Sequence, residues 1–247
     1  MFKTKKISFF IVLITLLFTS STNAQYTTKT AKASKQFDPK VVAAWRKAGA
    51  LVGWLAHSPN GGWHYLRAKP KTVSSLPAFV WRKFEPSRLI NLPTPSVPFA
   101  MGFGNTGINN SGLKELKRFK NLRSLDLSHT KVTDAGLKNL DEVKSLRNLD
   151  LGASAVTDTG LKALAKIQHL QKLYFGSTRV TDAGLKALIG LRGLKTLYLY
   201  NTKVTDAGLL KLANLKHLQF LVLVKTKVTV KGIAKLKQAL PELRIVH

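Results

Sequence analysis

The stretch TRVTDAGLKALIGLRGLKTLYLYN, from Thr178 to Asn201, decides the fold because variants of it recur along the chain every 24 residues. Each unit opens with threonine or serine, has valine or isoleucine two places on, and has glycine six places on. The openers are Thr106, Thr130, Ser154, Thr178, Thr202 and Thr226. The glycines are Gly112, Gly136, Gly160, Gly184, Gly208 and Gly232. A period between about 20 and 50 residues is typical of a solenoid, propeller or array.

Inside one unit, the apolar spacing changes from helical to extended. Leu161, Leu164 and Ile167 recur every three residues, as on one face of a helix. Leu173 and Phe175 then alternate with other residues, which is typical of a strand. A threonine and an aspartate precede most of the helical parts, as Thr157 and Asp158 do, and either can accept hydrogen bonds from the free N–H groups of the first turn. The aspartate also opposes the helix dipole, so we interpret the recurring aspartates as capping residues. We therefore expect each unit to hold a capped short helix and a short strand of a parallel sheet.

The unit also carries a family resemblance. Leu122, Leu125, Leu127 and Thr130 follow the pattern L-x-x-L-x-L-x-x-T, which resembles the leucine-rich repeat. The VTDAGL variant is similar to exported bacterial relatives in the ribonuclease-inhibitor-like subclass. The resemblance covers residues 99–247 and implies an α/β leucine-rich-repeat solenoid, a curved arc with a parallel sheet on its concave face and short helices on its convex face. Many relatives have an asparagine ladder where this chain has threonine or serine, whose hydroxyls we expect to bond the neighbouring turn.

The N-terminal segment reads as a secretory signal. Lys3, Lys5 and Lys6 precede an apolar run from Ile7 to Phe18, and small and polar residues follow as far as Ala24. Twelve residues are too few to span a bilayer, which takes about 20. We therefore predict cleavage of residues 1–24 after Ala24 and export to the periplasm, the cell surface or the exterior. Residues 25–36 are predicted to be a disordered basic tether.

Residues 37–98 are predicted to form an N-terminal α+β cap. They hold all four tryptophans, a helical segment at 39–50 and a hairpin at 52–66 that turns at Pro59–Gly62. A separate ligand-binding domain around the tryptophans is the alternative. Residues 99–247 are predicted to be the repeat domain, with a start strand and six 24-residue repeats, the last about two residues short.

Composition excludes several classes of protein. Of 247 residues, 40 are Lys or Arg and 12 are Asp or Glu, so the net charge is +28; 45% are hydrophobic and none is cysteine. This chain is too apolar for intrinsic disorder, and it cannot be a disulfide scaffold, a zinc ribbon or a thiol enzyme. His57 and His64 flank the predicted hairpin turn without an evident third ligand. No catalytic motif is apparent, so we expect no enzyme, no cofactor and no metal.

The predicted concave face carries the candidate binding site. Alternate strand residues face outward, and these change from acidic and small to aromatic and aliphatic along the arc. The predicted exposed apolar patch is Tyr174, Tyr198, Tyr200, Phe220, Val222 and Val224, with Asp126 and Asp150 at the acidic end. Such patches usually mark protein interfaces, so we expect a protein partner. Ordinary drift between repeats, or cover by another copy of the chain, would also explain the patch.

Basic residues beside the predicted strands suggest a second binding mode. They form two discontinuous rails: Arg123, Lys131, Arg147, Arg179, Lys195, Lys203 and Lys227. An acidic glycan or another extracellular polyanion could follow these rails, as in an adhesin, whereas specific nucleic-acid binding is not expected. A scaffold that self-associates through its C-terminal edge is the second alternative.

Overall fold

The computed structural model describes residues 36–57, 63–70 and 75–247. The predicted signal segment, nearly all of the predicted tether and the whole of the predicted hairpin turn lie outside these residues. The strands are β1 (Leu51–His57), β2 (Trp63–Leu66), β3 (Ser75–Val80), β4 (Phe99–Gly102), β5 (Leu122–Asp126), β6 (Asn148–Asp150), β7 (Lys172–Tyr174), β8 (Thr196–Tyr198), β9 (Phe220–Val222) and β10 (Arg244–Val246). The α-helices are α3 (Pro39–Lys47), α4 (Asn110–Lys114), α5 (Asp134–Leu137), α6 (Asp158–Leu164), α7 (Asp182–Leu185), α8 (Asp206–Leu209) and α9 (Val230–Ala239).

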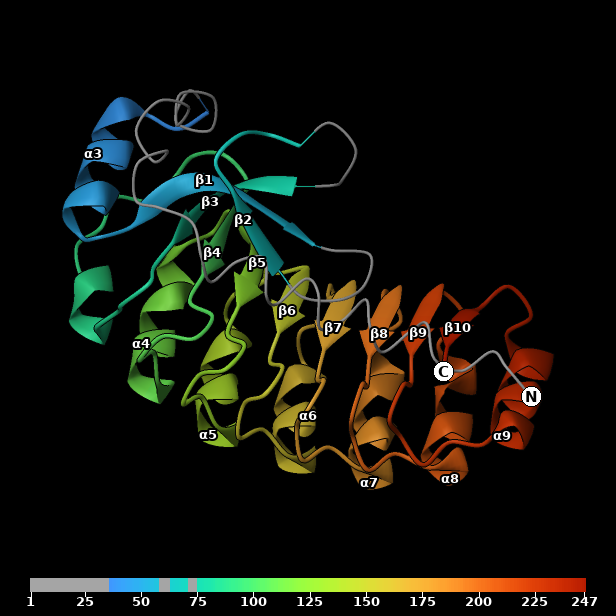
Figure 1. Cartoon of the computed structure of the whole chain (residues 1–247). Helices are drawn as coiled ribbons and strands as arrows, with labels where there is room; N and C mark the ends of the chain where they lie inside the picture. Colours follow the sequence, from blue (N-terminus) through green and yellow to red (C-terminus); the bar gives the residue numbers. More distant parts are fainter. Residues whose placement is uncertain (1–35, 58–62, 71–74) are drawn as a thin grey trace, which may run out of the picture.

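These strands form one sheet in the order β10-β9-β8-β7-β6-β5-β4-β3-β1-β2. Neighbours from β3 to β10 are parallel, whereas β1 pairs antiparallel with both β2 and β3. From β5 to β10, each residue pairs with the residue 24 positions on, as Leu125 does with Leu149. The sheet lines the concave side of an arc and α4–α9 line the convex side (Figure 1). The predicted leucine-rich-repeat solenoid is confirmed.

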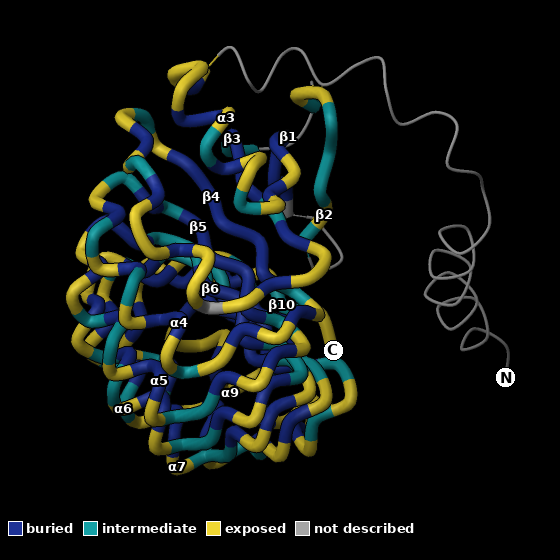
Figure 2. Tube along the Cα trace, turned by 90° about the vertical axis from the view of Figure 1, so that its left-hand side faces the viewer, coloured by how far each residue is buried: buried dark blue, intermediate teal, exposed yellow. Residues whose placement is uncertain are grey.

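A single apolar core runs between the sheet and the helices. The central leucine of β5 to β9 is fully buried in every strand: Leu125, Leu149, Leu173, Leu197 and Leu221. The leucine after each repeat glycine is also fully buried from α4 to α8: Leu113, Leu137, Leu161, Leu185 and Leu209. Burial of such a side chain contributes about 1.5–3 kcal/mol. The dark tube segments in Figure 2 follow this layer from the cap into the repeats.

The aspartates at the helix starts bind the next repeat. In four repeats the aspartate Oδ1 accepts the backbone N–H of a threonine 23 residues on, at 2.8 Å, and Oδ2 accepts its hydroxyl at 2.6–2.7 Å. The pairs are Asp134–Thr157, Asp158–Thr181, Asp182–Thr205 and Asp206–Thr229. The threonine hydroxyl then caps its own helix, as Thr181 Oγ1 accepts the N–H of Ala183 at 3.3 Å. The predicted threonine cap is thus confirmed for α6 to α9, whereas the prediction that the aspartate caps its own helix is wrong. We call the contacts between repeats the Asp–Thr ladder.

The repeat glycine makes room for this ladder. A Cβ placed on Gly184 would overlap Asp158 Oδ1, and one on Gly208 would overlap Asp182 Oδ1. Each polar or small residue of the V-T-D-A-G-L motif therefore has its own part. The threonine caps the helix, the aspartate binds the next repeat, and the glycine leaves room for the aspartate of the preceding repeat. In the last repeat Val230 stands where aspartate would, and its side chain is 76% exposed.

The threonine and serine openers bond within their own turn. Thr130 Oγ1 donates to Leu127 O and Thr178 Oγ1 donates to Phe175 O, each at 2.6 Å. The prediction that these hydroxyls bond the neighbouring turn is wrong. Backbone groups join the turns instead, as where the N–H of Ala153 donates to Gly176 O at 2.8 Å.

Aromatic side chains hold the N-terminal region. Trp45 stacks on Phe79, with ring centroids 4.0 Å apart, and Trp81 stacks on Phe103 at 4.8 Å. Both indoles also bond the backbone, since Trp45 Nε1 donates to Pro93 O at 2.8 Å and Trp81 Nε1 donates to Ala48 O at 3.2 Å. This cluster continues into the core of the repeats, so the region covers the first repeat as a cap does.

Candidate functional site

The strand register arranges the outer face of the sheet in two rows. One row is Gly102, Asp126, Asp150, Tyr174, Tyr198 and Val222. The second row is Ala100, Ser124, Asn148, Lys172, Thr196 and Phe220. Because adjacent strands lie about 4.8 Å apart, side chains within a row are direct neighbours. The predicted site residues of the strands are therefore brought together on the concave face.

The predicted exposed patch is half wrong. Tyr174, Tyr198 and Val222 are only 3%, 7% and 9% exposed, so they form a buried cluster on the concave face. The three other predicted residues, Tyr200, Phe220 and Val224, are half-buried and pack against that cluster. The accessible part of the patch is therefore smaller than predicted and lies over β8 and β9.

Trp63 explains part of this burial. It begins β2 and lies edge-on to Tyr174, with ring centroids 6.2 Å apart, although five strands of the sheet stand between β2 and β7. The cap strands bend over the concave side toward β5 and β6 (Figure 1). The sequence predicted Trp63 only as part of the cap. The curvature that brings β2 over β7 cannot be read from the residues around Trp63.

The rings on the concave face form a continuous series. Tyr174 and Tyr198 have centroids 4.6 Å apart, and Tyr198 and Phe220 have centroids 5.7 Å apart. At the outer side, Lys225 Nζ lies 5.4 Å from the centroid of the Tyr200 ring, within cation–π range. Burial raises the pKa of Tyr198 to about 12, so its phenol is neutral at physiological pH.

Two carboxylates occupy the N-terminal half of the same row. Asp126 Oδ1 accepts the N–H and the hydroxyl of Ser128 at 2.9 and 2.7 Å, and Asp150 Oδ1 accepts the N–H of Gly152 at 2.8 Å. Both side chains are buried, at 8% and 4% exposure. Burial raises the pKa of Asp126, and burial together with Asp126 raises the pKa of Asp150 to about 8. Because the two carboxylates lie side by side, they titrate as a pair.

The structure divides the predicted basic rails into two kinds of residue. Arg123 Nη1 donates to Ser145 O at 2.9 Å, and Arg147 Nη1 donates to Lys144 O and Leu146 O at 3.0 Å. These two guanidinium groups therefore stabilise loops. The five others, Lys131, Arg179, Lys195, Lys203 and Lys227, are exposed.

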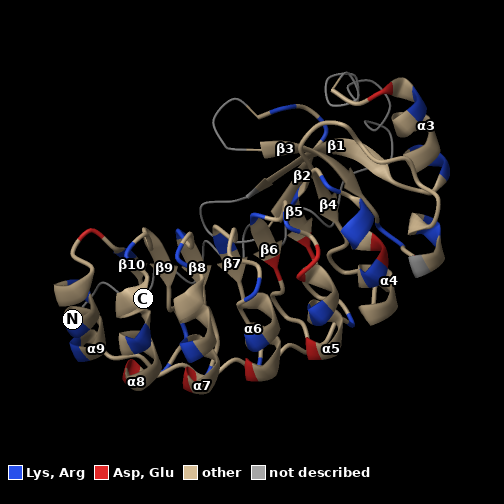
Figure 3. Ribbon diagram, turned by 180° about the vertical axis from the view of Figure 1, so that it is seen from behind, with Lys and Arg blue, Asp and Glu red and all other residues tan. Residues whose placement is uncertain are grey.

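Few of the cations have an acidic partner. Among the residues that the structure describes, Arg88 and Glu85 form the single ion pair, at 3.9 Å. Figure 3 shows Lys and Arg along the whole arc, whereas α5 to α8 carry acidic residues at one end. The positive charge of the repeats is therefore largely uncompensated by local contacts.

Comparison with known families identifies the repeats. A family model described as Leucine Rich repeat matches residues 120–140, 144–165 and 166–188. Three of the repeats thus match the leucine-rich repeat, in line with the leucine-rich-repeat fold of the chain. No curated protein matches its sequence. In the described part of the chain, no helix has the length and apolar character needed to cross a membrane.

Several solved structures are similar to this chain at low identity. Internalin InlF from Listeria monocytogenes is 20% identical with a TM-score of 0.48, over 59% of this chain and 46% of that one. Internalin C2 from the same organism is 23% identical with a TM-score of 0.46, over 87% and 85%. A leucine-rich-repeat protein from Leptospira interrogans is 21% identical with a TM-score of 0.45, over 60% and 43%. This chain thus spans less than half of the first and third of these chains.

Proposed function

We propose that this protein is a non-catalytic, exported binding module that holds a protein partner on the concave face over β8 and β9. The observation that carries the proposal is the aromatic and aliphatic surface formed by Tyr200, Phe220 and Val224 on the side of the sheet away from the core. The leucine core does not need these side chains, because it lies on the opposite face of the same strands. Leucine-rich-repeat proteins are typically binding scaffolds, which fits this assignment.

The chemistry of the surface suits a protein partner. Tyrosine combines a large apolar ring with a hydroxyl group, and interface hot spots are enriched in it. The half-buried rings of Tyr200 and Phe220 pack against the buried cluster of Tyr174, Tyr198 and Val222, which restricts their motion. A rigid aromatic surface loses little conformational entropy on binding, which favours affinity.

We further propose that the chain is of the exported bacterial VTDAGL type, in the ribonuclease-inhibitor-like subclass. The motif recurs in the repeats, and residues 1–24 have the composition of a cleavable signal. Export would place the concave face among envelope or extracellular proteins.

The binding proposal can be tested with the chain recovered from the cell envelope, after N-terminal sequencing has checked that it begins at Gln25. Partners captured by this chain are identified, purified and titrated against it. Changing Tyr200→Ala together with Phe220→Ala should weaken binding at least tenfold. The matched control is Leu210→Ala, because Leu210 is an exposed apolar residue on the helical side.

Unchanged affinity of the double variant would contradict the concave site. Binding that survives the double change and falls steeply with salt would instead support the alternative of an acidic glycan or another polyanion on the basic rails. That alternative is favoured by the lack of ion pairs among the described repeats. A molecular mass that rises with concentration in light scattering would support self-association through the exposed edge of β10.

A further inference from the structure

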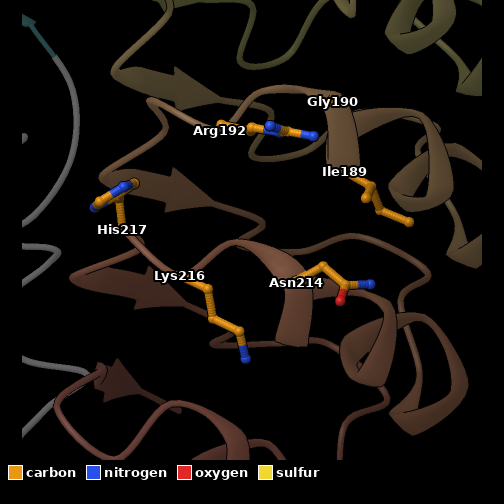
Figure 4. A pocket seen from close by; sticks show the side chains of 6 residues that line it. All are labelled: Ile189, Gly190, Arg192, Asn214, Lys216 and His217. Atoms are coloured by element: carbon orange, nitrogen blue, oxygen red, sulfur yellow. The ribbon is translucent and has the colours of Figure 1, made fainter.

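A pocket of about 540 Å³ lies away from the concave face, where the chain enters β8 and β9. Its walls are two successive loops, and the lining residues are Ile189, Gly190, Arg192, Asn214, Lys216 and His217 (Figure 4). The volume is within the range of about 300–1,000 Å³ that is typical of small-molecule sites. No acidic residue is among those that line it.

Gly190 leaves part of this space open, whereas nearby Gly193 does not line the pocket and faces the preceding loop. A Cβ added to Gly190 would meet no heavy atom within 4 Å, and one added to Gly193 would lie 3.6 Å from the nearest atoms, an ordinary contact. Neither glycine has a positive φ. Packing and backbone conformation therefore leave both positions free to carry a side chain.

Equivalent positions in other repeats do carry side chains. Lys166 and Asn214 stand 24 residues before and after Gly190, and His169 and His217 stand in the same relation to Gly193. A second hollow, between the segments that precede β5 and β6, has a volume of about 250 Å³. Its lining includes Glu142 beside Lys117, Lys120 and Lys144. The larger pocket is thus distinguished by the missing side chain at Gly190 and by a lining without carboxylates.

The lining residues offer donors to an anion. In Figure 4 the Arg192 side chain extends along one loop toward Gly190, and the Asn214 amide projects from the other loop. His217 lies at the opposite end, and Lys216 points away from Arg192 on an exposed, flexible stem. A guanidinium group presents paired N–H donors that match the geometry of an oxyanion.

We propose that this pocket binds a small hydroxylated ligand that carries an oxyanion, namely a sugar acid or a sugar sulfate. The guanidinium of Arg192 holds the oxyanion, the amide of Asn214 bonds hydroxyl groups from the other wall, and the body of the ligand occupies the space left by Gly190. The volume exceeds the need of a bare inorganic ion, and the lining offers apolar surface for the C–H groups of a sugar ring beside polar groups for its hydroxyls. The site is separate from the concave protein-binding surface and does not depend on it.

The test uses the full chain, with amide chemical shifts read by NMR while the ionic strength is held constant. The probes are glucuronate and glucose 6-sulfate, with glucose as the neutral control. We expect saturable shifts at Gly190, Gly193 and Arg192 with either anionic sugar, and none with glucose. The relative affinity of the two probes tells a carboxylate ligand from a sulfate ligand.

Two variants and one control locate the site. Arg192→Gln should weaken binding at least tenfold, and Gly190→Phe should block it without removing charge. Arg179→Gln removes the same charge at the opposite ends of the strands, because Arg179 follows β7 whereas Arg192 precedes β8. This variant should leave binding unchanged. Equal weakening by Arg179→Gln and Arg192→Gln, or shifts spread over all basic loops, would overturn the proposal in favour of diffuse electrostatic attraction. Tyr200→Ala with Phe220→Ala should have no effect, which separates this test from that of the concave site.

Discussion

The aspartates on the two sides of the arc differ in what surrounds them. On the convex side, Asp134, Asp158, Asp182 and Asp206 each accept two hydrogen bonds from a threonine of the next repeat. On the concave side, Asp126 and Asp150 stand side by side in buried positions, and burial raises the pKa of both. The periodic aspartates serve stacking, whereas the two concave ones oppose folding when both are charged.

Removing a ladder carboxylate should have the largest effect. Asp182→Ala leaves the N–H and hydroxyl of Thr205 without their partner, and we expect the free energy of unfolding to fall by about 2–4 kcal/mol. Urea denaturation followed by circular dichroism measures this loss.

Asp182→Asn is the matched variant, because the chain already contains an amide version of the contact. Asn110 Oδ1 accepts the N–H of Thr133 at 3.0 Å, and Asn110 Nδ2 donates to Thr133 Oγ1 at 2.9 Å. We therefore expect Asp182→Asn to keep most of the stability. An equally large loss in both variants would mean that the charge, and not the pair of hydrogen bonds, stabilises the stack.

The effect of the concave aspartates on the free energy of unfolding should depend on pH. Asp150 keeps its proton up to about pH 8 in the folded state but loses it near pH 4 when unfolded, so its contribution to stability falls as pH rises between these values. Asp150→Asn removes this loss and still accepts from Gly152. We expect the variant to be more stable than the native chain by at least about 1.4 kcal/mol at pH 9, with little difference near pH 4.

Denaturation curves at several pH values between 4 and 9 measure this difference. Glu142→Gln, at an exposed position, is the control for a general change of charge. A gap between Asp150→Asn and the native chain that stays constant with pH would contradict a buried, protonated carboxyl.

Much of the fold could be predicted because periodicity records contacts that every repeat shares. The buried leucines, the helix–strand alternation and the two rows of the concave face all follow from the spacing of 24 residues. The Asp–Thr ladder was missed because a contact between repeats has the same period as a contact within one. Asp158 could cap its own helix or reach Thr181, and the sequence is identical in both cases.

The exposed fraction of the side chains on the concave face could not be predicted in the same way. Tyr174 was expected at the surface because its position along β7 faces away from the core, and that orientation is correct. Its burial depends on neighbours such as Trp63, which lies more than 100 residues earlier in the chain. The distance between those rings is set by the curvature of a sheet of ten strands, a property of the whole arc.

The end of the ladder offers the smallest and most discriminating test. Val230 follows the N-cap Thr229 and stands where the other repeats have aspartate, and residues 231–247 contain no threonine that could contact it. Val230→Asp therefore restores only the interaction of a carboxylate with the dipole of α9, which is worth about 0.3–1 kcal/mol. We expect a gain in the free energy of unfolding within that range, measured by urea denaturation at low salt and reduced at high salt. A gain as large as the loss in Asp182→Ala would show that the aspartates act on their own helices, and the contrast between the two sides of the arc would then rest on helix capping instead of stacking.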